Sequence, residues 1–137
     1  MNRSTAERID AFREKVVRLD KLQAFLIEER PWVAAAAERF QDYFDEQDRL
    51  LDLPSSDETM ELIYQHNLKS RREFEAGREK WAVYGECVKQ YVALPREVLA
   101  EWEELSQIVP EGHDLRPQLE EIAKQFISLA ELSLMAV

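Results

Sequence analysis

Few side chains in this sequence could perform acid–base, nucleophilic or metal chemistry, and their spacing favours none of it. The histidines are His66 and His113, and neither has a glutamate three residues before it, the spacing that di-iron helical bundles use. The single cysteine, Cys87, excludes an internal disulfide and a multi-cysteine zinc site, and it stands beside Val88 on an apolar helical face. We therefore expect no metal ion, no cofactor and no catalytic site, and a chain that is not an enzyme.

Acidic residues outnumber basic ones, 28 to 18, which gives a formal net charge of −10. Residues 31–53 hold six acidic and two basic groups, and residues 95–112 hold five and one, so each segment carries −4. Binding to phosphate backbones usually requires clustered Lys and Arg, and this charge argues against direct nucleic-acid binding. Representative members of these two segments make up a candidate acidic face: Asp42, Asp45, Glu46, Glu101 and Glu104.

The one basic cluster after residue 30 has glutamates interleaved with it. Lys69 precedes Glu73 by four residues and Arg71 precedes Glu75 by the same spacing, which favours ion pairs along a helix. We expect the cluster to neutralise itself rather than to attract a ligand.

The composition is that of a helical protein, with only three glycines and five prolines in 137 residues and many strong helix formers. Ser4 and Glu7 form a possible capping box for a first helix, and Pro31 is expected to end it near Glu28 or to kink it. Pro31 then suits the first position of a second helix. The segment "LPSSDETM" interrupts the apolar pattern, with Ser55 and Glu58 as a second possible capping box.

The third predicted helix is the longest, at about residues 56–92. Its apolar face keeps a helical period through Gly77 and Gly85, which favours one unbroken element. Pro95 is expected to start a fourth helix, and Asp114 can cap a fifth. The sequence therefore predicts an all-α protein: an antiparallel bundle of four to five helices with one long central helix (about 56–92), in a single domain, 1–137.

The length of that central helix motivates a prediction of self-association. Thirty-six residues span roughly 54 Å, whereas neighbouring helices of about 22 residues span only ~33 Å, so part of the apolar face would lack an intramolecular cover. The apolar tail "FISLAELSLMAV" raises the same question. We expect a homodimer, with interface residues drawn from both segments: Phe74, Gly77, Trp81, Tyr84, Val88, Tyr91, Leu132 and Met135.

Three functions are compatible with these patterns. The first is a non-enzymatic helical module for protein–protein interaction or oligomerisation. The second is an acidic inhibitor or immunity-type protein, including a nucleic-acid mimic, whose acidic face would occupy a basic site on a target. The third is a small enzyme or cofactor binder with a pocket in the bundle core, for which the sequence nominates no groups. The charged start "MNRSTAERID" and the short apolar run "WVAAAA" predict no signal peptide and no membrane span, hence a cytoplasmic protein.

Overall fold

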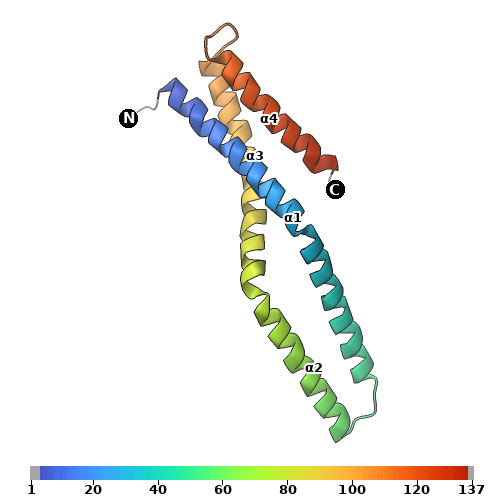
Figure 1. Ribbon diagram of the computed structural model, residues 1–137. Helices are drawn as coiled ribbons and strands as arrows, with labels where there is room; N and C mark the ends of the chain where they lie inside the picture. The colour runs from blue at the N-terminus through green and yellow to red at the C-terminus, as the bar shows by residue number, and fades with distance from the viewer. Residues whose placement is uncertain (1–3, 136–137) are drawn as a thin grey trace. The chain divides into compact units, whose positions relative to one another are not determined.

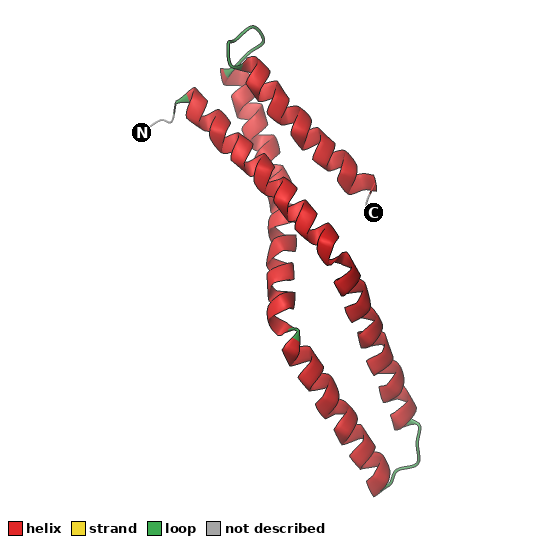
Figure 2. Cartoon of the chain, in the orientation of Figure 1, coloured by secondary structure: helices red, strands yellow, loops and turns green. Residues whose placement is uncertain are grey.

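The computed structural model describes residues 4–135, with side chains up to Leu132. This part of the chain forms four helices and no strand (Figures 1 and 2). The helices are α1 (Thr5–Leu51), α2 (Asp57–Ala76), α3 (Arg78–Ile108) and α4 (Arg116–Met135). The predicted all-α bundle is confirmed, and the number of helices lies in the predicted range.

The chain divides into two compact units. Unit 1 comprises residues 1–27 and 86–137, and unit 2 comprises residues 28–85. Helices α1 and α3 each contribute residues to both units. Within the described residues, no helix is both long enough and apolar enough to cross a membrane.

Unit 1 packs the first half of α1, the second half of α3 and α4 around one hydrophobic core. Arg8 pairs with Glu104 near the start of α1, and Arg18 donates to Gln90 further along it, so α1 and α3 run antiparallel. The loop before α4 returns the chain antiparallel to α3 (Figure 1). The core residues follow the helical periods of the sequence: Ile9, Phe12, Val16, Leu19, Leu22, Leu94, Val98, Leu105, Val109, Leu119 and Ile122.

One polar side chain lies among these core residues. Gln23 is only 6% exposed, and its Nε2 donates to the carbonyl oxygen of Leu129 at 2.9 Å and to the Tyr91 hydroxyl at 3.3 Å. A buried amide needs such partners, because desolvating it without them costs free energy. Gln23 thereby links α1 to both other helices of unit 1.

Unit 2 is an antiparallel helical hairpin formed by the second half of α1 and by α2, with the first residues of α3 continuing beyond α2. The Tyr43 hydroxyl donates to Asn67 Oδ1 near the middle of the hairpin, and Lys80 pairs with Glu29 at 3.2 Å towards its open end. Helix α2 starts after an N-cap at Ser56, whose Oγ accepts from the Thr59 backbone N–H at 3.1 Å. The predicted cap at Ser55 was therefore one residue too early.

Pro31 and Pro95 do not start new helices, contrary to the boundaries predicted there. Both lie inside continuous helices, α1 and α3. An interior proline costs about 3 kcal/mol, since it removes one backbone hydrogen bond and crowds the preceding turn. At Pro95 this is offset by the neighbours Leu94 and Val98, which are both buried in unit 1 and whose burial contributes about 1.5–3 kcal/mol each.

The predicted long helix (about 56–92) is interrupted at Gly77 and its second part continues to Ile108, so the longest of the described helices is α1 instead. At Gly77 the backbone has φ −93° and ψ −1°, and the Gly77 N–H contacts the carbonyl oxygens of both Glu73 and Phe74, at 3.3 and 3.2 Å. This shared hydrogen bond is typical of a tightened last turn. A new helix, α3, starts at Arg78 and passes through Gly85.

Candidate functional site

A groove of about 860 Å³ lies in unit 2 between α1 and the α2–α3 turn, and we call it the aromatic groove. Small residues line it from both sides, Ala36 on α1, Ser70 on α2 and Gly77 at the turn. Larger side chains form the walls. The complete lining is Trp32, Ala36, Arg39, Phe40, Tyr43, Gln47, Asn67, Ser70, Arg71, Glu73, Phe74, Ala76, Gly77 and Trp81.

The aromatic rings of the groove contact one another across the hairpin. The ring centroids of Trp32 and Trp81 are 4.7 Å apart, and those of Phe40 and Phe74 are 6.1 Å apart in an edge-to-face arrangement. The Lys80 ammonium lies 4.6 Å from the Trp32 ring centroid while it pairs with Glu29. Such ring pairs are worth about 0.5–1.5 kcal/mol beyond the area that they bury, so they hold the groove walls in place.

Polar groups of the groove's other end bond to one another. The Tyr43 ring stacks on His66 with centroids 4.7 Å apart, and the His66 Nε2 lies 3.1 Å from the Tyr43 carbonyl oxygen. The Ser70 hydroxyl donates to the His66 carbonyl oxygen at 2.9 Å. His66 is thus part of the packing between α1 and α2 rather than a group presented to a ligand.

The basic residues beside the groove do not form the predicted i,i+4 ion pairs, although Lys80 nearby pairs with Glu29. Among the described residues no ion pair within 4.0 Å joins Lys69 to Glu73 or Arg71 to Glu75, although the spacing allows both. Arg71 instead lines the groove together with Arg39 and the carboxylate of Glu73. Exposed i,i+4 pairs contribute only tenths of a kcal/mol, so solvation of the separate charges competes with pairing.

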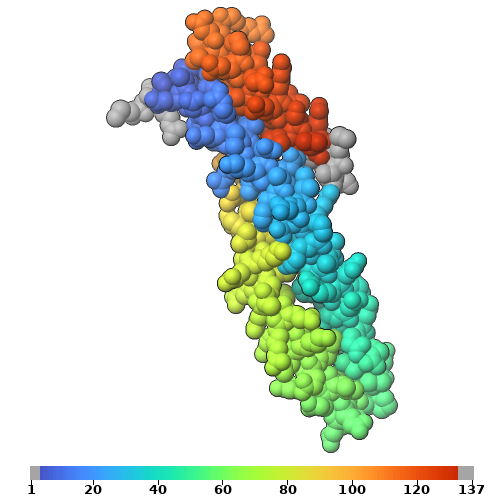
Figure 3. All heavy atoms as spheres, viewed as in Figure 1, coloured from blue at the N-terminus to red at the C-terminus, as the bar shows by residue number. Residues whose placement is uncertain are grey.

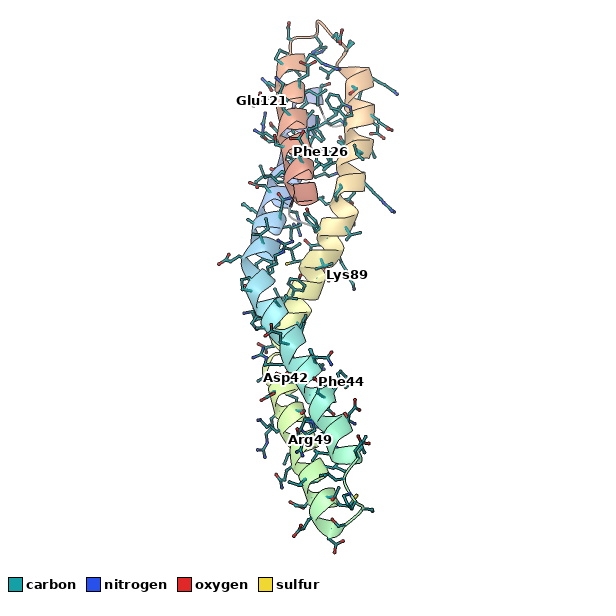
Figure 4. The ribbon with its side chains drawn as sticks, turned by 90° about the vertical axis from the view of Figure 1, so that its right-hand side faces the viewer. Asp42, Phe44, Arg49, Lys89, Glu121 and Phe126 are labelled. Carbon is teal, nitrogen blue, oxygen red and sulfur yellow. The ribbon has the colours of Figure 1, made fainter. Side chains whose placement is uncertain are left out.

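Large exposed apolar side chains, two of them also groove-lining (Phe40 and Phe74), extend the hydrophobic surface along the hairpin. On α1, Phe40, Phe44 and Leu51 are 38%, 55% and 62% exposed. On α2, Met60, Tyr64 and Phe74 are 61%, 60% and 55% exposed. We call these six residues the open face. Figure 3 shows the two helices of unit 2 side by side along their length, and Figure 4 shows Phe44 on the opposite side of α1 from Asp42.

The predicted interface residues are distributed over both units. Phe74, Gly77 and Trp81 line the groove, and the Tyr84 ring packs on Trp81 at 6.2 Å in an edge-to-face contact. Residues further along belong to unit 1, where Val88 is half-buried, Tyr91 packs against the core and Leu132 is 53% exposed. The side chain of Met135 lies outside the described residues. The opposite wall of the groove contains Trp32 and Phe40, which are not among the predicted interface residues.

The predicted acidic face contains both ion-paired and unpaired carboxylates. In unit 1, Glu101 and Glu104 both pair with Arg8, at 3.3 and 2.7 Å. In unit 2, Arg49 donates hydrogen bonds to Glu46, which lower the pKa of that carboxyl group. Asp42 and Asp45 are exposed, and Asp45 accepts a hydrogen bond from the Gln41 side chain.

Groups capable of metal or thiol chemistry lie apart from one another. No cluster of three or more His, Cys, Asp or Glu side chains able to hold a metal ion occurs within residues 4–132. Cys87 is half-buried and packs against the core of unit 1, consistent with its place on an apolar helical face.

Comparison of the chain with protein-family models, with curated proteins and with solved structures found no match. The groove and the open face are the features of the described residues that bear on its function.

Proposed function

We propose that the chain is a non-enzymatic helical module for protein–protein interaction or oligomerisation, with the cytoplasm as its expected location. The observation that carries this proposal is the aromatic groove with the open face beside it. Solvent-exposed aromatic and methionine side chains are enriched in protein interfaces relative to other surfaces. Contiguous apolar patches of several hundred Å² on a folded protein generally mark a contact site.

The chemistry of the groove suits a macromolecular partner. Its rings are fixed by contacts with one another, so little side-chain entropy is lost when a partner covers them. Arg39 and Arg71 add charged donors at the edge, where polar rims of interfaces normally lie. A partner that fills the groove with an apolar side chain would bury Phe40 and Phe74 together.

The experiment compares capture of protein by the wild-type chain and by two variants, with the mass of each intact complex measured. Phe74→Asp places a carboxylate on the groove wall, and Val92→Asp adds the same charge at a residue that is 64% exposed in unit 1. The proposal expects Phe74→Asp to lose its complex and Val92→Asp to keep it. Equal complexes with all three chains would show that the groove is not the contact surface.

A further inference from the structure

We propose that the occupant of the open face is the open face of a second copy of this chain, so that two hairpins form a four-helix bundle. This inference rests on the proposed function and names the partner of the same surface. It has three supports: the periodicity of the exposed residues, the width of the face and its area.

The exposed residues form one stripe on each helix of the hairpin. On α1, Phe40, Phe44 and Leu51 follow spacings of four and seven residues, which return to the same side of a helix. On α2, Met60 and Tyr64 are followed by Asn67, Arg71 and Phe74, again in steps of three and four. Phe40 and Phe74 line the same groove, so the two stripes share one side of the hairpin. They run for about 17 and 21 Å at 1.5 Å per residue, and therefore nearly match in length.

The width of this side favours two covering helices over one. Packed helices lie about 8–10 Å apart, so a single helix laid along the groove would contact only the inner edges of both stripes. Phe44 and Met60 would remain exposed. A second hairpin supplies two helices at the same separation and covers both stripes, which is the arrangement of a four-helix bundle. Because both surfaces are the same patch, the contact closes with twofold symmetry and leaves no further site open.

The exposed area is sufficient for a specific dimer. A whole aromatic side chain presents roughly 200 Å², so six apolar side chains that are each about half-exposed offer on the order of 600 Å² per copy. Two copies would then bury on the order of 1,200 Å² before any contribution from the polar rim. This value reaches the lower end of the range for specific protein–protein interfaces.

Charged residues that follow the spacing of the two stripes are Asp48, four residues after Phe44, and Arg71 on α2, and they have opposite signs. Asp42 leaves α1 on the side opposite to Phe44, so it stays in solvent when the open face is covered (Figure 4). Polar residues of the groove beside the open face include Gln47, Asn67 and Arg71, whose amide and guanidinium groups can exchange hydrogen bonds across the symmetry axis. Polar groups at isolated positions of an apolar helical interface fix its register and its number of chains.

The test is sedimentation equilibrium of the full chain from low to high micromolar concentration. The wild type is expected to be a dimer of 16.1 kDa subunits. Phe44→Asp puts a carboxylate into the face of both copies and is expected to weaken dimerisation by at least roughly 100-fold, the effect typical of an interface hot spot. Val92→Asp is the matched control and should leave the dimer intact. Circular dichroism verifies folding, and Tyr64→Lys replaces Phe44→Asp if that variant fails to fold.

A photo-crosslinking amino acid locates the contact. Placed at position 44 it should join two copies at residues of the open face, and placed at position 92 it should join none. A monomeric wild type that captures a different protein through Phe74 would overturn the second copy as occupant and keep the interaction module. If the wild type is a monomer and Phe74→Asp captures the same protein equally well, both the second copy as occupant and the proposed interaction module are overturned. A dimer unaffected by Phe44→Asp and Tyr64→Lys, with no crosslink from position 44, would overturn this inference alone.

Discussion

Replacing each glycine by alanine gives a test of the backbone, because the three positions predict different effects on stability. Gly85 lies inside α3, and a Cβ built there meets no heavy atom within 4 Å. Alanine in a helix interior is favoured over glycine by about 0.8–1 kcal/mol, so Gly85→Ala should raise the free energy of unfolding by about that amount. Gly112 has φ +89°, where alanine is strained, and Gly112→Ala should lower it by roughly 1–2 kcal/mol.

Gly77 is the informative case, because it lies on the apolar face of the predicted central helix and the structure places it at the end of α2. A Cβ at Gly77 would lie 3.7 Å from Trp81 Cδ1 and 3.9 Å from two carbonyl oxygens of its own helix, which are ordinary van der Waals distances. Its φ of −93° is open to any L-residue. Gly77→Ala should therefore stabilise the protein by about 0.4–1 kcal/mol, through the reduced freedom of the unfolded chain.

Urea denaturation followed by circular dichroism measures all three variants. Tryptophan fluorescence adds information about the units, since Trp32 and Trp81 belong to unit 2 and Trp102 to unit 1. Gly85→Ala serves as the reference, because it measures the increase in the free energy of unfolding when alanine replaces glycine inside a helix. If Gly77→Ala destabilises the protein by about 1 kcal/mol or more while Gly85→Ala stabilises it, the turn requires glycine and the account of Gly77 given above is wrong.

Three further predictions concern local contacts. Ser56→Ala removes the N-cap of α2 and should cost about 1 kcal/mol in urea denaturation, whereas Ser55→Ala should change little, and equal effects would contradict the cap assignment. Gln23→Ala should cost about 2–3 kcal/mol in the same assay, because it removes the hydrogen bonds to the Leu129 carbonyl and the Tyr91 hydroxyl and opens a cavity in unit 1, and a cost under about 0.5 kcal/mol would count against that role. The pKa of Glu46 is lower in the folded state, so its contribution is present above the unfolded pKa and is lost as the pH falls through the folded one. Glu46→Gln should remove that part of the acid dependence, and an unchanged pH profile would refute it.

Unit 1 shows what hydrophobic periodicity could predict. Ile9, Phe12 and Val16 recur at helical spacing and are all buried, as are Val98 and Leu105 of α3. Each helical face has a core to pack against, so the pattern in the sequence and the burial in the structure have one cause.

Helix boundaries were less predictable, because they depend on contacts beyond the local sequence. A proline removes one hydrogen bond wherever it stands, but whether a helix continues through it depends on what its neighbours bury, as Leu94 and Val98 do beside Pro95. Gly77 presents the reverse problem. One tightened residue hardly changes the angular phase, so Phe74 and Trp81 stay on one side although the helix between them is interrupted. Periodicity therefore could not distinguish a continuous helix from two helices joined at Gly77.

The sequence singled out one wall of the groove but not the other. The position of the other wall depends on which residues of α1 lie opposite which residues of α2 in the hairpin. The sequence marked Phe74, Gly77 and Trp81 because they share the face of one predicted helix, while the opposite wall belongs to another. The position of the loop around Ser55 was sufficient to predict which residues lie opposite one another. Tyr43 lies 12 residues before Ser55 and contacts Asn67, which lies 12 residues after it. An antiparallel hairpin of equal rise in both arms pairs residues at equal distances from its turn. A predicted hairpin at this loop, in place of a general bundle, would have set the aromatic side chains before the loop against those after it.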